Sequence, residues 1–549
     1  MSDFDTIVIG SGAGGLTAAL LLAQAGQRVL VLEQHYVPGG WCHAFELGGH
    51  RFSPGVHYIG DLGRGGRFGQ LLAGLGVTRY LSFFELNRDG YEHVRIGSER
   101  FDFPKGRLAL GERLKERFPR ESKGIDAYLE TCRKMGDELL RVLEFRNVVW
   151  DLATLPFKAP TVARWGTATY QRLLDHYFDD PLLKAILSVQ AGDHGLSARR
   201  APATLHVGVA AHYFEGGYYP RGGGGALSRA FVRAFKREGG KLRLRARVER
   251  ILLDGGRAVG VRLADGTELR AAAVLSNADP DMTFGQLVGP EHIGWRARRK
   301  LRRTRYSAAA ISLFSAVDMD LAAAGYDSGN YWYQRSLDED LLEACRDPHL
   351  AERDELPGSF TTISSLKDRT KRHHGQDVVE SFLFVPFETF APWADTRFGE
   401  RPAAYEDLKR RFGDQLIRTT DRIFPGFAEH LVMSDVGTPL TNVHYVASAR
   451  GNAYGTEKNA QQIGPWAYRV ETPVRGLFMC GASTVGHGVF GAVLSGLLAA
   501  ARMLRSEPLE LLQHYDEVRI YPADDPSLWP AELQSKLREP QPRPASEVA

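Results

Sequence analysis

Three glycines near the start of the chain, Gly10, Gly12 and Gly15, form a Gly-x-Gly-x-x-Gly turn between an apolar run and a small-residue segment. In such a turn the first glycine allows a tight bend, the second lets the backbone approach a pyrophosphate, and the third lets a helix lie close on a strand. Glu33 follows at about the ~20-residue spacing at which a carboxylate accepts the hydroxyls of an adenosine ribose. These residues predict a bound adenine dinucleotide.

The loop after Glu33 indicates which dinucleotide is bound. Pro38, Gly39 and Gly40 follow that acid and provide a second place where backbone can come close to a ligand. This favours FAD over NAD, because FAD continues through a ribityl chain into the protein. The residues of this first unit that we expect to contact the cofactor are Gly10, Gly12, Ala13, Gly14, Gly15, Glu33, Gln34, Gly39, Gly40 and Trp41.

A second glycine-rich stretch lies near the other end of the chain, at residues 476–496. An apolar strand is expected to end at Gly481, and a helix is expected from about Val489 to Leu504. The N-terminus of that helix suits a flavin, since reduction places negative charge at the flavin N1 and C2 carbonyl edge and the helix dipole stabilises it. Further expected contacts are Gly481, Ala482, Ser483, Gly488 and Val489, and also Val248, on a strand whose backbone could bond to an adenine.

Three side chains are candidates for the proton transfer that redox chemistry at a carbon centre requires. The segment that comes soon after the first unit should pass near the flavin. We therefore expect Gly55, Val56 and His57 to lie near the flavin ring. The candidate donors are His57, Tyr219 in a glycine-dense loop, and Asp193 in an Asp-His turn. A packed histidine bonded to backbone is the simpler interpretation of His57, and turns favour Asp on local grounds alone.

Composition excludes several classes of protein. The 549 residues are 43% hydrophobic and 25% charged, and their formal net charge of +3 is too small to indicate nucleic acid as a partner. The four cysteines form no Cys-x-x-Cys pair, so we expect no metal site, disulfide framework or dithiol redox centre. A strand begins within a few residues of Met1 and no stretch reaches ~18 apolar residues, so we expect neither a signal peptide nor a spanning helix. A cytoplasmic location is the simplest expectation.

The surrounding elements predict an α/β fold, with a discontinuous Rossmann-type FAD-binding domain into which an α+β substrate domain is inserted. Helical periodicity dominates residues 63–211, and Lys241–Leu253, Ala258–Leu263 and Thr267–Leu275 are expected to form a β meander. Strand-like runs at Ala308–Val317 and Val378–Phe387 predict a sheet in the substrate domain. The expected parts are a FAD-binding domain at 1–62, 212–290 and 436–505, a helical insertion facing substrate and membrane at 63–211, a substrate sheet with helices at 291–435, and a C-terminal extension at 506–549, disordered from Glu539.

Two stretches mix basic and aromatic residues, as is typical of a protein that lies against a membrane. Residues 148–165 suit a helix in the membrane interface, and the seven basic side chains of Trp295–Arg305 could attract anionic lipid headgroups. Ordinary domain packing and a solvated helix face explain the two stretches as well. From the two stretches together we expect the protein to associate peripherally with a membrane.

Together these residues resemble the FAD-dependent phytoene desaturase, carotenoid isomerase and retinol saturase group within the amine-oxidase-like flavoproteins, and the retinol saturase branch most closely. The motifs that carry the resemblance lie at residues 39–45, 52–60, 192–195, 212–223, 438–442 and 450–455. The resemblance implies one non-covalent FAD between two halves of a discontinuous domain. It also implies a lipophilic polyene, a retinoid or carotenoid, in a tunnel over the isoalloxazine of a peripheral membrane protein. Ser53 and the pair Ala482-Ser483 depart from the pattern, since acids usually stand at both places.

A retinol-saturase-like reductase acting on carbon–carbon double bonds is the activity that this resemblance implies. A carotenoid desaturase or cis–trans isomerase is the alternative in the same fold, since residues 486–489 resemble that branch as much. A non-catalytic, FAD-holding polyene carrier is the alternative of another class, motivated by Ser53 and Ala482. We expect no second dinucleotide-binding unit of the kind that starts the chain, and so no separate NAD(P)H domain; electrons would come from docked NAD(P)H, a redox protein, a quinone or the substrate itself.

Overall fold

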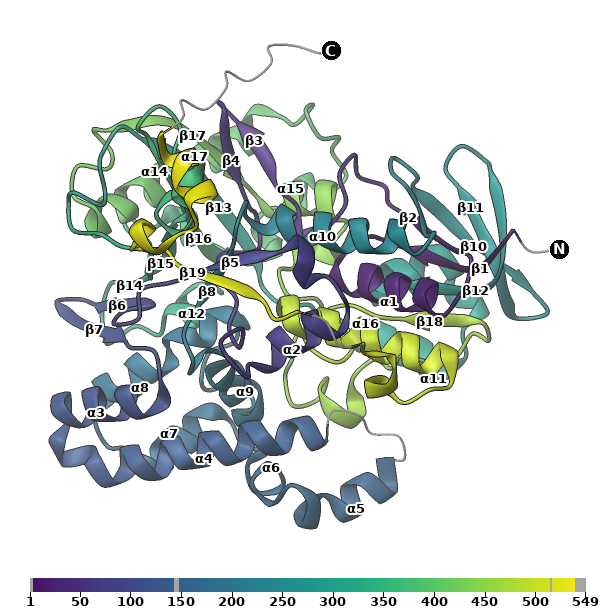
Figure 1. Ribbon diagram of the computed structural model, residues 1–549, viewed down its shortest axis with the longest axis horizontal. Helices are drawn as coiled ribbons and strands as arrows, with labels where there is room; N and C mark the ends of the chain where they lie inside the picture. The colour runs from purple at the N-terminus through teal and green to yellow at the C-terminus, as the bar shows by residue number, and fades with distance from the viewer. Residues whose placement is uncertain (1–2, 143–147, 514–515, 539–549) are drawn as a thin grey trace.

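Two sheets organise the molecule, and both are assembled from segments that lie far apart in the chain (Figure 1). The computed structural model describes residues 3–142, 148–513 and 516–538, so the disorder expected from Glu539 lies outside the described residues. Helices and strands are both abundant, and the predicted α/β class is confirmed.

The first sheet contains the N-terminal strand and is covered by three helices. Its strands are β1 (Phe4–Ile9), β2 (Val29–Leu32), β9 (Lys241–Arg243), β10 (Val248–Asp254), β11 (Arg257–Leu263), β12 (Glu268–Ser276) and β18 (Leu477–Met479). Their order is β10-β11-β12-β1-β2-β9, and β18 also pairs with β12. The helices are α1 (Ala13–Gln24), α10 (Gly224–Arg237) and α16 (Gly488–Leu504), with α1 in contact with both of the others (Figure 1).

Small residues bring α1 against the sheet and against α16. β2 and the second half of β1 consist of buried apolar residues, as strands covered by helices require. A Cβ atom on Gly15 would clash with the carbonyl oxygen of Gly10, and one on Gly496 would clash with that of Gly14. Glycine at these two positions therefore lets the backbone of α1 contact the backbone of the turn and of α16 directly. This contact holds the N-terminus of α1 at the edge of the sheet where the parallel strands end.

The predicted meander is present as β10, β11 and β12, which pair antiparallel. The prediction of one run at Lys241–Leu253 is wrong, because β9 ends at Arg243 and Arg245 has a left-handed φ of 53° before β10 begins. β9 pairs in parallel with β2. This turn thus sends the chain from one edge of the sheet to the other.

The second sheet carries the strands expected near Ala308 and Val378. In spatial order it consists of β17 (Leu431–Gly437), β13 (Ala309–Val317), β16 (Asp377–Val385), β15 (Gly358–Ile363), β14 (Asn330–Gln334), β6 (Glu92–Ile96) and β7 (Glu99–Phe103). The expectation that residues 63–211 are mainly helical needs correction at their start, where β6 and β7 lie. β6 is ordered by parallel pairing with β14, more than 200 residues further along the chain, and local periodicity carries no signal of such a partner.

Beyond β7 this segment is helical as predicted. It contains α3 (Arg107–Arg117), α4 (Ser122–Arg141), α5 (Val148–Lys158), α6 (Pro160–Trp165), α7 (Tyr170–Tyr177), α8 (Pro181–Ser188) and α9 (Ala203–Tyr213), which form the lower layer in Figure 1. α4 packs against α9. Among the helices of the described residues, none combines the length and apolar character that crossing a membrane requires.

The remaining elements complete the structure. The remaining helices are α2 (Arg67–Gly74), α11 (Trp295–Arg303), α12 (Leu341–Ala344), α13 (Ser364–Lys367), α14 (Ala403–Ile423), α15 (Pro439–Val446) and α17 (Ala531–Arg538). Two small sheets consist of β3 (Phe45–Leu47) with β4 (His50–Phe52), and of β19 (Arg519–Pro522), β5 (Ser82–Glu85) and β8 (Tyr218–Pro220). The C-terminal extension thus joins the body of the protein through β19.

Candidate active site

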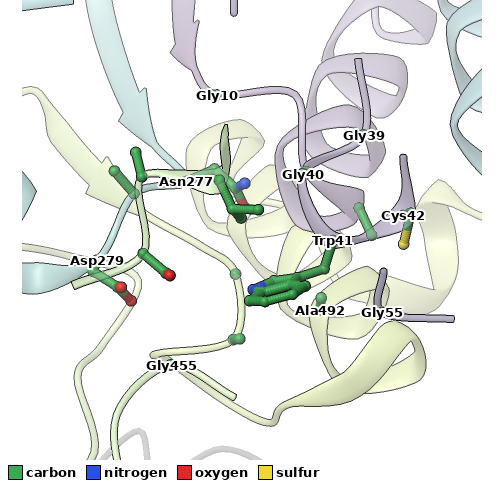
Figure 2. Close-up of a pocket in the computed structure, with 18 of the residues that line it drawn as sticks. Gly10, Gly39, Gly40, Trp41, Cys42, Gly55, Asn277, Asp279, Gly455 and Ala492 are labelled. Atoms are coloured by element: carbon green, nitrogen blue, oxygen red, sulfur yellow. The ribbon is translucent and has the colours of Figure 1, made fainter. Parts of the chain in front are cut away.

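A cleft with walls from both sheets contains most of the residues predicted to bind a cofactor (Figure 2). The space that its walls enclose is about 1800 Å³ when the open solvent at its mouth is included. The predicted residues on its wall are Gly10, Gly12, Ala13, Gly14, Glu33, Gln34, Gly39, Gly40, Trp41, Gly55, His57, Val248, Gly481, Ala482, Ser483, Gly488 and Val489. Gly15 and Val56 lie behind this wall, packed against Gly10 and Gly224.

The glycine turn presents backbone N–H groups to the cleft. Gly12 precedes α1 without a side-chain cap, and the first turn of α1 holds no acidic residue. A Cβ atom on Gly12 would lie 2.6 Å from Asn277 Nδ2, and one on Gly14 would lie 2.9 Å from the carbonyl oxygen of Ala492. Uncapped N–H groups and the positive end of the helix dipole attract phosphate. The turn therefore has the form that a pyrophosphate requires.

Glu33 is held in one orientation at the end of β2. Its Oε2 atom accepts hydrogen bonds from the backbone N–H and the hydroxyl of Ser11, at 2.9 and 2.6 Å, and its Oε1 atom accepts one from the N–H of His35 at 2.8 Å. The Ser11 hydroxyl oxygen also accepts a bond from the N–H of Gly39 at 3.1 Å. The carboxylate keeps acceptor capacity toward the cleft, where a ribose hydroxyl can bind.

The start of α16 is a second uncapped helix N-terminus on the same wall. His487 precedes the helix and forms no side-chain cap, and Gly488 and Val489 line the cleft. The turn before it abuts β12, since a Cβ atom on Gly481, which has φ 97°, would lie 2.7 Å from Asn277 Oδ1. This geometry suits the edge of a flavin that becomes negative on reduction.

Sequence reasoning missed two residues that follow β12. Asn277 lies between the glycine turn and the Gly481 turn, and Asp279 lies on the wall beyond it (Figure 2). β12 runs parallel to β1, and ligands of open α/β sheets bind where the parallel strands end. The available signal was therefore the polar character of the residues directly after a predicted strand. Residues 452–455 of the wall belong to a motif of the family resemblance, although no role was assigned to them, and residues 445–448 carried no comparable signal.

The part of the cleft toward the second sheet is apolar and aromatic. Ala310 and Ser312 of β13 and Phe382 and Phe384 of β16 line it together with Tyr454. The ring centroids of Phe382 and Phe384 are 5.7 Å apart, and those of Phe384 and Tyr454 are 6.1 Å apart. Rings in this arrangement form a wall that suits a flat apolar ligand.

Of the three predicted proton donors, His57 lies on the wall of the cleft. Its ring stacks on Phe382 with centroids 5.4 Å apart, and its Nδ1 atom lies 3.4 Å from Oε2 of buried Glu380. Burial alone would raise the pKa of Glu380, but His57 and the charge of Lys371 lower it overall. An ionised carboxylate thus faces Nδ1, which leaves Nε2 as the ring nitrogen available to a ligand.

Asp193 and Tyr219 are not among the residues that line the described cleft. The hydroxyl of Tyr58 donates a hydrogen bond to Asp193 Oδ2 at 2.5 Å, and Lys371 Nζ donates one to the hydroxyl of Tyr219 at 3.2 Å. Burial raises the pKa of Asp193 well above its usual value, and the charge of Glu92 adds to this effect. Both side chains are therefore held by hydrogen bonds outside the lining of the described cleft.

Two buried charges, Glu92 of β6 and Lys367 of α13, also lie outside this lining. Trp332 Nε1 donates to Glu92 Oε2 at 2.7 Å, and Lys367 Nζ donates to the carbonyl oxygen of His57 at 2.8 Å and to Asn330 Oδ1. Burial raises the pKa of Glu92 to about 7 and lowers the pKa of Lys367 to about 7. Titratable groups with such shifts beside a cleft are typical of sites that move protons.

Taken together, the residues of the cleft fit FAD. The two uncapped helix starts suit a pyrophosphate and a flavin edge, Glu33 suits an adenosine ribose, and close-packed glycines at the turn leave room for a ligand against the backbone.

Comparison with known proteins identifies relatives along most of the chain. Residues 13–316 match the family model for flavin containing amine oxidoreductases. The chain is 31% identical to the all-trans-retinol 13,14-reductase of Rattus norvegicus, over 91% of this chain and 86% of that protein. It is 26% identical to the chloroplastic prolycopene isomerase of Arabidopsis thaliana, over 92% of this chain and 84% of that protein. The solved structure of cyclohexylamine oxidase from Brevibacterium oxydans IH-35A shares the fold, with a TM-score of 0.59 and 16% identity over 92% of this chain and 99% of that one.

Proposed function

Because the chain belongs to the family of flavin containing amine oxidoreductases, we propose that it uses FAD to reduce a carbon–carbon double bond of a lipophilic polyene, a retinoid or a carotenoid. The resemblance to the retinol saturase group and the FAD cofactor, both predicted from the sequence, are confirmed by these matches. The observation that carries the proposal is the form of the cleft, which joins a dinucleotide-binding half to an aromatic half.

The residues that would hold FAD follow from this form. The glycine turn after Gly10 would bind the pyrophosphate, Glu33 would bind the adenosine ribose, and Gly488 and Val489 would offer N–H groups to the flavin. When bound and reduced, FAD would supply the hydride, which carries the electron pair that the reduction of an alkene needs. The protein supplies an apolar wall that excludes water and holds a conjugated chain flat against Phe382.

His57 is the residue that we assign to the proton. Reduction of an alkene adds a hydride to one carbon and a proton to the next, and a side chain on the cleft wall must give that proton. Glu380 faces Nδ1, so Nε2 is the atom that gives the proton. Asp193 and Tyr58 hold a proton in a bond of 2.5 Å, which we assign to its resupply.

Anaerobic incubation of the photoreduced enzyme with all-trans-retinol tests the proposal. We expect a product heavier by two hydrogens that absorbs at shorter wavelength, while the flavin is reoxidised. His57→Phe should lower the rate by about 10²–10⁴-fold, the usual contribution of a general acid, and His349→Phe on the exposed surface is the matched control. Unchanged retinol would contradict the reductase, and unchanged flavin with bound polyene would indicate a carrier.

A cis–trans isomerase is the second candidate, favoured by the similarity to prolycopene isomerase over 92% of the chain. Isomerisation leaves the mass of the polyene unchanged and needs no net proton. Incubation of the reduced enzyme with a cis-carotene, followed by chromatography, would show a shifted isomer pattern under this function. A product heavier by two hydrogens would exclude it.

Peripheral membrane contact is the part of the proposal that concerns delivery of the substrate. On α5, Trp150 is 64% and Phe157 is 88% exposed, and on α11 the 61% exposed Trp295 precedes six arginines and lysines. Exposed aromatic and basic side chains of this kind bind interfaces of anionic lipid. Flotation with vesicles of phosphatidylserine should carry the protein upward, and Trp150→Ser with Phe157→Ser should reduce this. Equal flotation of both proteins would contradict the role of α5.

The source of electrons belongs to the same proposal. Addition of NADPH, of a reduced redox protein and of a quinol in turn to the oxidised enzyme without oxygen should bleach the flavin with one of them. If none of them bleaches it and the polyene does, the polyene is the electron donor, and the enzyme oxidises it rather than reducing it.

A further inference from the structure

Asp279 is a charged residue on the cleft wall to which neither the sequence motifs nor the family match assigns a role. In Figure 2 it lies across the cleft from Gly39 and Gly40, and Gly455 lies on its side of the cleft. Its position follows from the order of the strands, since β12 pairs with β1 on one side and with β18 on the other. β1 leads to the glycine turn and β18 leads to the start of α16, so a residue after β12 lies between these two helix starts.

Three hydrogen-bond donors hold the carboxylate of Asp279. Its Oδ1 atom accepts a bond from the hydroxyl of Ser483 at 2.6 Å, and its Oδ2 atom accepts bonds from the N–H of Ala449 at 2.9 Å and from Asn452 Nδ2 at 2.8 Å. A carboxylate has about four acceptor positions, so one position on Oδ1 is left for a ligand in the cleft.

The donors come from two segments that form the same part of the wall. Ala449 and Asn452 belong to a loop in which Ala447 and Arg450 have left-handed φ angles of 54° and 55°. A Cβ atom on Gly455 of this loop would lie 2.7 Å from the Ser483 hydroxyl oxygen. Left-handed backbone conformations at residues other than glycine persist where the surrounding contacts hold them. Asp279 provides such contacts, because it accepts hydrogen bonds from both the loop and the Ser483 turn. Its place on the wall is therefore rigid.

An anion at this place selects the chemistry of the ligand group that lies against it. A phosphate would be repelled, and the glycine turn already provides for the pyrophosphate. A hydroxyl can donate to the free acceptor position on Oδ1. The part of FAD that lies between the pyrophosphate and the flavin ring is the hydroxyl-bearing ribityl chain.

We propose that Asp279 binds a ribityl hydroxyl of FAD and so fixes the distance between the glycine turn and the start of α16. The proposal rests on the FAD site described above. It distinguishes two halves of the cofactor: ADP, which lacks the ribityl chain and the ring, makes no use of Asp279, whereas FAD does.

Titration of the apoprotein with FAD and with ADP tests this proposal. In Asp279→Asn, we expect the dissociation constant of FAD, measured from flavin fluorescence, to rise about 10- to 100-fold, as for loss of a hydrogen bond to a charged group. The dissociation constant of ADP, measured by calorimetry, should stay within about twofold of its wild-type value. Asp281→Asn is the matched control, since this carboxyl lies two residues further on and is not among the residues that line the described cleft.

Ser483→Ala provides a second variant that leaves the charge in place. Loss of the Ser483 donor frees Oδ1 to move, so we expect weaker FAD binding by several-fold and unchanged ADP binding. Equal loss of FAD and ADP affinity in Asp279→Asn would assign a purely structural role to Asp279 and overturn the proposal. Unchanged or tighter FAD binding would overturn it as well, while failure of the wild-type protein to take up FAD would refute the cofactor site itself.

Discussion

Replacement of Lys367 tests whether the buried amine behind His57 is neutral in the native protein. Its side chain is 0% exposed, and burial lowers its pKa from 10.5 to about 7, although the charge of Glu92 opposes the fall. The fall corresponds to about 5 kcal/mol at 1.36 kcal/mol per pKa unit. Between pH 10.5 and about 7, the unfolded chain carries a proton that the native amine lacks. The free energy of unfolding therefore rises with pH by about 1.4 kcal/mol per unit in this range, and the gain is lost as the pH falls through about 7.

Lys367→Met removes this dependence on pH. Burial also raises the pKa of Glu92 to about 7, so the comparison is made in a Glu92→Gln background, where that carboxyl is absent from both proteins. From urea titrations, we expect the free energy of unfolding of E92Q minus that of E92Q/K367M to be about 2 kcal/mol higher at pH 9.5 than at pH 8.

Lys123→Met is the matched control, because this side chain on α4 is exposed in the native protein as well as in the unfolded chain. Its effect on stability should be equal at the two pH values. A constant difference between E92Q and E92Q/K367M would mean that Lys367 keeps its proton inside the protein, and the reasoning from burial would be refuted.

Three further predictions concern the cleft and the layer behind it. Gly14→Ala should reduce the amount of FAD that copurifies and destabilise the protein by about 1–3 kcal/mol, because the new Cβ atom would lie 2.9 Å from the Ala492 carbonyl oxygen. Gly294→Ala is the control: its Cβ atom would have no atom within 4 Å, so neither the FAD content nor the stability should change. Phe384→Leu should weaken polyene binding about two- to tenfold by loss of a ring contact and leave the affinity for FAD unchanged, which absorbance titrations with both ligands measure. Tyr58→Phe should destabilise the protein by about 1–3 kcal/mol in urea titrations, since buried Asp193 loses its donor at 2.5 Å, and an unchanged midpoint would contradict this.

The cofactor half of the site could be predicted because its signals are local. Gly10, Gly12 and Glu33 lie on one strand–helix–strand unit, where spacing along the chain sets the spacing in space. The start of α16 was found in the same way, from an apolar strand, a turn and a small-residue helix. Glycines in these turns are required by backbone contact, which the sequence expresses directly.

Two strands of the aromatic half were expected, but which of their side chains line the cleft could not be predicted, because this depends on pairings between distant segments. Phe382 reaches the cleft because β16 pairs with β13 within a sheet whose far edge comes from β6 and β7, in a segment expected to be mainly helical. Asp193 and Tyr219 carried suitable chemistry in the sequence, but the packing places them outside the lining of the described cleft. Glu92 and Lys367 showed no pattern at all, since a buried charge is recognised only when the atoms that surround it are known.

The sequence by itself determined that this chain binds a dinucleotide, which dinucleotide it is and to which group of flavoproteins it belongs, because backbone geometry at a few glycines encodes these properties. Only the tertiary structure decided which side chains face the ligand, which stand behind them and where Asp279 lies. Burial, charge and proton affinity depend on contacts between residues hundreds of positions apart, and no local pattern contains them.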